Sequence, residues 1–155
     1  MKLSRILLSV SLLLCSTISL ADSLIGSRVP PYPKPWKVEG GTCLLNCTYN
    51  IGVLKKAEQR LLYLGKALPK SNANDVRWQI LDVMPYPELP KGYELAEMAC
   101  EVNGVADPSV MAIVKTAETE WLDQVRFAYK ANTEQGAFET ISTQGIRCGN
   151  LAWGL

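Results

Sequence analysis

Histidine is absent from this chain of 155 residues. Its absence excludes the serine–histidine and cysteine–histidine nucleophile pairs of most hydrolases, and it removes the commonest transition-metal ligand. The sequence also contains neither a Gly-x-Gly-x-x-Gly motif nor a phosphate-binding P-loop. We therefore expect a protein that is not an enzyme, with no catalytic residue, no cofactor and no bound metal.

An excess of charge of either sign is also absent, since the whole chain has 16 basic and 15 acidic residues. A nucleic-acid-binding domain usually carries a basic excess, so we expect no nucleic-acid partner. Long apolar runs are scarce too. The longest lies near the N-terminus and has about ten strongly apolar residues, where a membrane span needs about 20. The mature chain is therefore expected to contain no transmembrane segment.

The first 21 residues have the organisation of a secretory signal peptide. Lys2 and Arg5 form a basic start, residues 6–14 are apolar, and Ser19 and Ala21 place small residues where a signal peptidase reads them. We therefore predict a signal peptide over residues 1–21. The mature chain then begins at Asp22 and is periplasmic or secreted.

Four of the five cysteines follow this signal: Cys43, Cys47, Cys100 and Cys148. An even number of cysteines in a small exported protein indicates disulfide bonds, here two. Three pairings are compatible with the sequence. We favour bonds from Cys43 and Cys47 to the two distant cysteines, because a longer closed loop removes more entropy from the unfolded chain.

Residues 22–42 predict a proline-rich N-terminal arm. Its prolines, which fix an extended backbone without donors for a helix or a sheet, are Pro30, Pro31, Pro33 and Pro35. We expect the arm to lie over the domain. The alternative is a proline-rich ligand for the aromatic groove of a partner, in which Tyr32 and Trp36 would make the contacts.

The clearest predicted helix spans residues 51–67, with Asn50 as its N-cap and Pro69 after its end. Apolar side chains in this segment and directly after it recur at spacings of three and four, which is typical of the buried face of a helix. They are Leu54, Ala57, Leu61, Leu64 and Leu68.

Two further helices are predicted, one over residues 92–102 and one over residues 108–122, the second starting at Asp107 and Pro108. The first has three acidic residues near one another: Glu94, Glu97 and Glu101. We interpret them as a solvated helix face and not as a calcium site or a pair of catalytic acids.

Strands are predicted in two places. Val76, Trp78 and Ile80 alternate with polar residues, which predicts a strand over residues 76–84. Residues 125–130 alternate in the same way, and residues 132–136 resemble a hairpin connection into a second strand over residues 137–148.

Together these elements predict the α+β class. Residues 43–155 are expected to form a small disulfide-stapled single domain with an N-terminal helix and a C-terminal antiparallel hairpin. The alternative is an all-α domain, because residues 108–130 also carry a continuous helical stripe.

The C-terminal third resembles the CNP1-like family of exported bacterial proteins. The resemblance covers residues 125–148. It consists of the motifs Val125-Arg126-Phe127, Gly136-Ala137 and Ile141-Ser142-Thr143-Gln144-Gly145-Ile146-Arg147-Cys148. It implies export and a β-rich C-terminal hairpin, and it implies no particular activity.

These observations favour an exported, non-catalytic protein that binds another macromolecule of the bacterial envelope, as an inhibitor, an immunity factor or part of an assembly. Aromatic residues beside prolines or near the chain end are the candidate interface: Tyr32, Trp36, Tyr86 and Trp153. The alternative is a periplasmic thiol or Cu(I) carrier, in which Cys43 and Cys47, one helical turn apart, would supply the thiolates.

Overall fold

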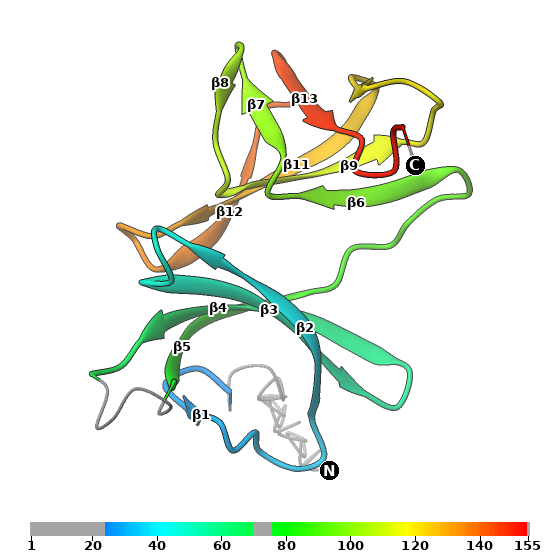
Figure 1. The fold of residues 1–155 in the computed structure, drawn as a ribbon. Coiled ribbons are helices and arrows are strands. Elements are labelled where there is room, and N and C mark those ends of the chain that lie inside the picture. The colour runs from blue at the N-terminus through cyan, green and yellow to red at the C-terminus, as the bar shows by residue number, and fades with distance from the viewer. Residues whose placement is uncertain (1–23, 70–75, 155) are drawn as a thin grey trace, which may run out of the picture.

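The computed structural model describes residues 24–69 and 76–154 (Figure 1). The predicted signal peptide, residues 1–21, lies outside the described residues. The described part of the chain forms thirteen strands and no helix, so both the predicted α+β class and the all-α alternative are wrong. Accordingly, these ranges contain no helix that is long and apolar enough to cross a bilayer.

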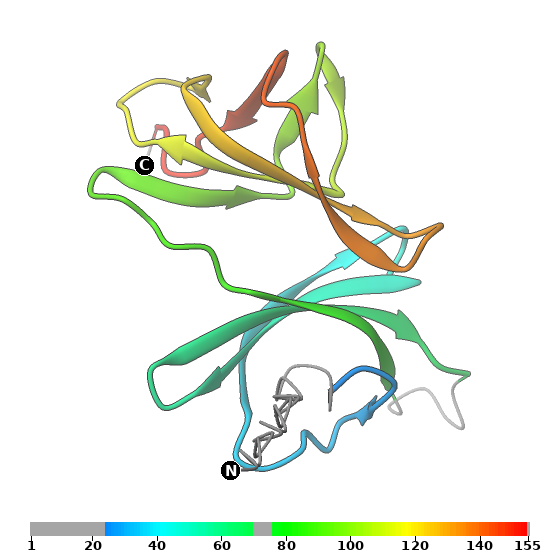
Figure 2. The same cartoon turned by 180° about the vertical axis from the view of Figure 1, so that it is seen from behind.

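Sheet A is the largest of the three antiparallel sheets. Its strands, in spatial order, are β1 (Arg28–Val29), β5 (Trp78–Pro85), β4 (Gln59–Ala67), β3 (Tyr49–Lys56) and β2 (Lys37–Leu44). The sheet curves around the N-terminal segment, which lies on its concave side in Figures 1 and 2.

Sheets B and C form the other half of the molecule. Sheet B has the order β12 (Ala137–Ile141), β11 (Val125–Asn132), β9 (Val110–Lys115) and β6 (Tyr93–Glu97). Sheet C has the order β10 (Trp121–Leu122), β13 (Ile146–Gly149), β7 (Cys100–Val102) and β8 (Val105–Ala106). The layers are therefore the N-terminal segment, sheet A, sheet B and sheet C.

Three apolar clusters hold these layers together. In the first, Leu24 and Trp36 of the N-terminal segment pack on sheet A side chains such as Leu61. Sheets A and B share a second cluster, where Leu62 and Leu64 meet Met111 and Ala131. Sheets B and C share a third, which includes Val110, Val114, Ile146 and both Cys100 and Cys148.

The predicted helix over residues 51–67 is instead the hairpin of β3 and β4, in which Leu54 lies opposite Leu61. Ala57, at the tip of this hairpin, takes a left-handed conformation with φ of 51°. Sheet A is covered on both faces, so the five central residues of β4, residues 61–65, are all buried. A strand buried on both faces shows no polar alternation, and its leucines therefore matched a helical spacing as well.

The other two predicted helices are also wrong, and burial on both faces explains the second of them. Residues 92–102 form β6 and β7, and residues 108–122 form β9 and β10. All of Val110–Val114 is buried, because sheet B lies between sheets A and C. The strand predicted over residues 76–84 is confirmed as β5, and the hairpin that follows residue 125 is confirmed as β11 and β12. The single second strand predicted over residues 137–148 is wrong, because the chain turns after Ile141 and residues 146–149 form β13 in sheet C.

The two predicted disulfides are present, but the pairing that we favoured is wrong. Cys43 bonds to Cys47, and Cys100 bonds to Cys148. Cys100 and Cys148 are directly opposite each other on β7 and β13, so the strand register brings them together. The two bonds indicate an oxidising, extracytoplasmic environment.

Sheets A and B are also joined by a polar contact. Phe138 on the edge strand β12 donates its backbone N–H to the Asp82 carboxylate of β5, at 2.7 Å. The same carboxylate accepts the N–H of Val83 at 2.9 Å. Asp82 thus satisfies an edge-strand donor that has no strand partner at that position and helps to orient the two sheets.

Candidate functional site

The structure places the four aromatic residues predicted as an interface in different surroundings. Trp36 is 7% exposed and belongs to the core cluster between the N-terminal segment and sheet A. Tyr32 packs against the same cluster and bonds through its hydroxyl to that of Tyr63, at 3.0 Å. Tyr86 is half-buried, with the Arg60 guanidinium 3.8 Å from the centre of its ring. Trp153 is 53% exposed.

The three glutamates expected on one helix face lie on two strands instead, Glu94 and Glu97 on β6 and Glu101 on β7. Glu101 pairs with Arg147 at 2.7 Å, and burial raises the pKa of Glu97. Within residues 24–69 and 76–154, no group of three or more histidine, cysteine or acidic residues is placed to hold a metal ion.

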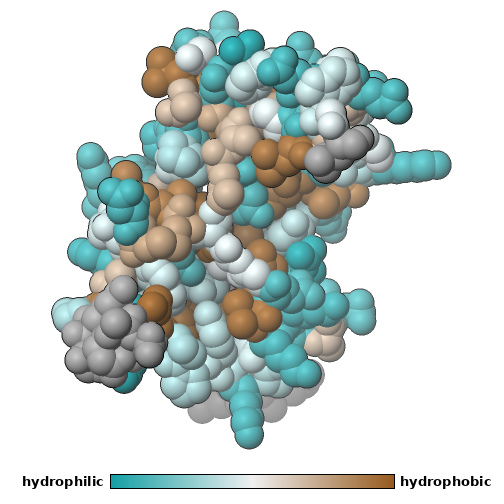
Figure 3. All heavy atoms as spheres, in the orientation of Figure 1, coloured by the Kyte–Doolittle hydropathy of each residue, from teal (hydrophilic) through white to brown (hydrophobic). Residues whose placement is uncertain are grey.

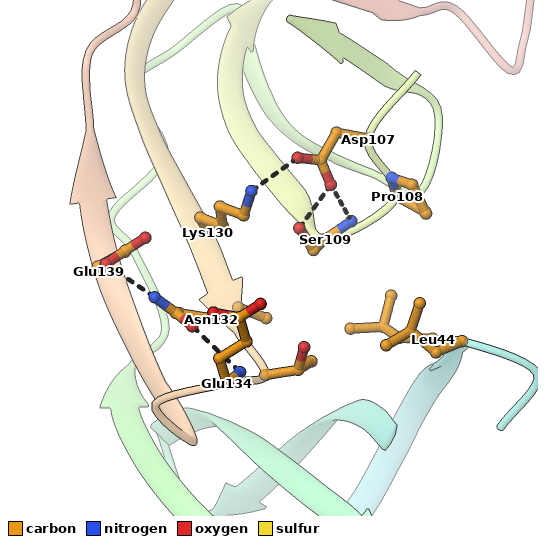
Figure 4. Close-up of a pocket in the computed structure, with 11 residues that line it drawn as sticks. Leu44, Asp107, Pro108, Ser109, Lys130, Asn132, Glu134 and Glu139 are labelled. Carbon is orange, nitrogen blue, oxygen red and sulfur yellow. Dashed lines mark hydrogen bonds and ion pairs between the residues drawn. The ribbon is translucent and has the colours of Figure 1, made fainter. Parts of the chain in front are cut away.

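Apolar side chains on the face drawn in Figure 3 lie in several separate groups among polar ones. A hollow is therefore a better candidate site than a broad apolar patch. A pocket of about 310 Å³ opens between the tip of the β2–β3 hairpin and the β11–β12 hairpin (Figure 4). Its lining residues are Leu44, Leu45, Asp107, Pro108, Ser109, Lys130, Ala131, Asn132, Thr133, Glu134 and Glu139.

One wall of the pocket is apolar and comes from sheet A. Leu44 ends β2, and Leu45 follows it in the turn toward β3. Both lie between Cys43 and Cys47, so the first disulfide closes the loop that carries this wall. Leu45 is 59% exposed, so the wall continues to the surface of the molecule.

The opposite wall is polar and begins with the sequence Asp107-Pro108-Ser109. The Asp107 carboxylate accepts the backbone N–H of Ser109 at 3.1 Å and its hydroxyl at 2.5 Å. Asp107 was predicted to start a helix, but in the structure the same capping chemistry forms the turn that leads into β9.

Lys130 of β11 donates to the second oxygen of Asp107 at 2.9 Å, as Figure 4 shows. Burial acts to raise the pKa of Asp107, but the hydrogen bonds from Ser109 and Lys130 and the charge of Lys130 outweigh it and hold this pKa below its usual value. A larger hollow of about 610 Å³ shares these two residues and extends toward Asn103 and Gln144. The ion pair therefore borders both hollows.

The floor and rim of the pocket come from the β11–β12 hairpin. Asn132 accepts the backbone N–H of Glu134 at 3.1 Å, and its amide donates to Glu139 at 3.4 Å. The lining contains one lysine, which Asp107 engages, and the further carboxylates of Glu134 and Glu139. The pocket is therefore acidic on one side and apolar on the other.

This arrangement is suited to binding. The Ser109 hydroxyl donates to the Asp107 carboxylate. Because the pKa of Asp107 is lowered, this carboxylate is a weak base for removing a proton from that hydroxyl. Lys130 is held in an ion pair with the same carboxylate. The pocket can instead bind a cationic group that has an apolar neighbour. Its carboxylates would pair with the cation, and its apolar wall would contact the neighbour.

The sequence alone does not predict this pocket. Cys43 and Cys47, which the sequence marks as candidate residues, flank two of its lining residues, but Lys130 and Glu139 belong to no motif. One usable signal was present: an Asp-Pro-Ser turn directly before a run of five apolar residues, two of them Val, at residues 110–114. Such a run is typical of a buried strand. The Asp-Pro-Ser turn directly before it then lies where that strand begins, at the edge of a sheet.

Comparison of the chain with protein-family models, with curated proteins and with solved structures finds no match. The resemblance of residues 125–148 to the CNP1-like family therefore stays a prediction.

Proposed function

We propose that this protein is exported to the bacterial periplasm or secreted, and that it acts without catalysis by binding another protein there, as an inhibitor, an immunity factor or part of an envelope assembly. The observation that carries the proposal is the pocket between the β2–β3 and β11–β12 hairpins, with its apolar wall and its acidic wall. The disulfide bonds support the location, since such bonds persist in oxidising compartments.

The lining of the pocket indicates what part of a partner it receives. Leu44 and Leu45 offer apolar contact, while Glu134 and Glu139 offer carboxylates on the other side. A lysine or arginine beside an apolar residue, on an exposed loop of the partner, matches both walls. Charge complementarity of this kind favours specific and rapid association, and salt weakens it.

The test is affinity capture from the cell envelope with the oxidised mature chain as bait. We expect a specific partner on the wild type and at least about a tenfold loss of retention on a Glu134→Gln/Glu139→Gln variant, because two charge contacts are removed. A Glu118→Gln/Glu120→Gln variant is the matched control, since both residues are exposed and lie outside the pocket.

Equal retention by the wild type and the pocket variant would overturn the proposal. So would the absence of any protein that the wild type retains more strongly than unrelated bait.

A further inference from the structure

We propose that the Cys43–Cys47 disulfide is a thiol–disulfide exchange site, which accepts electrons from a dithiol protein, and that the Cys100–Cys148 disulfide is a permanent structural bond. This inference goes beyond the proposed binding function and does not depend on it, because it concerns covalent chemistry at one bond. The two bonds lie in different surroundings.

The two bonds differ first in access. Cys43 and Cys47 are both exposed, whereas Cys100 is 1% exposed and Cys148 is fully buried. Exchange begins when a thiolate attacks one sulfur of the disulfide, so the attacking group must reach that sulfur. A thiolate from another protein reaches the first bond from solvent. It cannot reach the second while sheets B and C remain packed.

The place of Cys43 in the fold adds to this access. Cys43 lies near the end of β2, which is the outer strand of sheet A and pairs only with β3 within that sheet. The side of β2 away from β3 therefore has no sheet A strand across it.

The backbone between the two cysteines favours opening of the bond. Leu45, Asn46 and Cys47 all have positive φ, at 49°, 54° and 60°. Non-glycine residues rarely adopt this left-handed conformation, because their Cβ atoms crowd the backbone. Reduction frees these three residues to relax toward conformations that they prefer.

Opening is also local. The β2–β3 ladder holds the chain on both sides of the loop, up to the pair of Leu44 and Tyr49. The Cys43–Cys47 bond spans a sequence separation of 4, and the Cys100–Cys148 bond one of 48. A shorter closed loop restrains the unfolded chain less, so the fold depends less on the first bond than on the second.

Apolar contact for the approaching protein is present beside the bond. Leu45, between the two cysteines, is largely exposed, and so is Met98. Met98 lies close by, because its sulfur contacts the hydroxyl of Thr42, the residue before Cys43. Exposed apolar side chains of this kind offer contact area to a protein that approaches the bond.

The reaction balances without any further reagent. One thiolate of the dithiol protein attacks a sulfur of the Cys43–Cys47 bond, forming a mixed disulfide and releasing the other cysteine as a thiolate, which takes up a proton. The second thiol of the reductant then attacks the mixed disulfide. The protein gains two electrons and two protons as two thiols, and the reductant becomes a disulfide.

The first test is graded reduction of the native mature protein, followed by alkylation and peptide mass spectrometry. We expect Cys43 and Cys47 to be alkylated at a dithiothreitol concentration at least about tenfold lower than Cys100 and Cys148. Simultaneous reduction of both bonds, or earlier reduction of Cys100–Cys148, would overturn the inference.

The second test uses a dithiol protein as the probe: a thioredoxin whose second active-site cysteine is replaced by serine, so that the mixed disulfide persists. We expect a covalent adduct at Cys43 or Cys47 of the wild type. A Cys43→Ser/Cys47→Ser variant should form none while keeping the near-ultraviolet circular dichroism of the folded wild type. Absence of an adduct on the wild type, or an adduct at Cys100 or Cys148, contradicts the assignment.

Discussion

Replacement of Tyr63 by phenylalanine tests the polar network that lies under the N-terminal segment. Tyr63 is almost fully buried on β4, and its hydroxyl accepts a hydrogen bond from the Asn50 amide at 3.0 Å. The same hydroxyl is 3.0 Å from that of Tyr32. Its ring lies over Gly52, where a Cβ would collide with it. Tyr63→Phe therefore removes one oxygen and leaves the ring in place.

The expected loss of stability follows from the groups left behind. Asn50 is itself buried, and its side-chain oxygen has no hydrogen-bond partner among the described residues. Without the Tyr63 hydroxyl its amide nitrogen would lose its acceptor as well. A buried donor left unpaired costs about 1–3 kcal/mol, and the lost contact with Tyr32 adds about 1 kcal/mol. We expect a loss of about 2–4 kcal/mol in the free energy of unfolding.

A double-mutant cycle separates this reasoning from a general loss of packing. Asn50→Leu removes the amide that needs the acceptor, so Tyr63→Phe should cost at least about 1 kcal/mol less in that background. The assay is urea unfolding of the oxidised mature protein, followed by tryptophan fluorescence, since Trp36 and Trp78 lie in the same cluster. Tyr129→Phe is the control, with an expected change within about 0.5 kcal/mol.

Additive effects of the two substitutions, within about 0.5 kcal/mol, would refute the reasoning. A loss at Tyr63→Phe no larger than at Tyr129→Phe would refute it too.

The remaining predictions concern the two other polar contacts. Asp82→Ala should lower the free energy of unfolding by about 1.5–3 kcal/mol, because the N–H of Phe138 loses a charged acceptor. Asp82→Asn should lower it less. Equal urea midpoints for the wild type and the alanine variant would contradict this prediction. Lys130→Met should cost at most about 1 kcal/mol at pH 7, since both members of the pair are partly exposed. Because the pKa of Asp107 is lowered in the fold, its contribution is present above about pH 4 and is lost as the pH falls through the folded pKa. The difference between the two proteins should therefore shrink at pH 3, and a difference that grows there would contradict the assigned sign.

Some elements were predictable because their residues follow local rules. In β5, Trp78 and Ile80 are buried while Gln79 between them is less so, which preserves the alternation that predicts a strand. The β11–β12 hairpin was predictable from the same alternation and from the glycine in its turn. In the structure this residue, Gly136, takes a positive φ of 67°. Neither feature depends on what the rest of the chain does.

The leucine-rich segment followed no such rule. Leu61 faces the N-terminal segment and Leu62 faces sheet B, so both faces of β4 are apolar. The sequence then lacks the polar alternation that marks a strand with one solvated face, and a helix explains its spacing equally well. The N-terminal segment and sheet B, which cover the two faces of this segment, decide between a helix and a strand. A short stretch of sequence contains no information about those layers.

The disulfide pairing shows the same limit. Loop entropy favours distant partners, but Cys100 and Cys148 meet because β7 and β13 pair in a register that places them opposite each other. Cys43 and Cys47 are then left to each other at the tip of a hairpin. The candidate pocket could not be predicted from the sequence either, because Asp107 lies in the turn between β8 and β9, Lys130 lies on β11 of sheet B and Leu44 comes from sheet A.

The sequence by itself determined the exclusion of histidine chemistry, the number of disulfide bonds and the strands that keep one polar face. The tertiary structure alone decided which other segments became strands, which cysteines were joined and which side chains border a pocket. The physical reason is that local composition records whether a residue is apolar or polar, whereas its partners depend on how the sheets stack and in what register their strands pair.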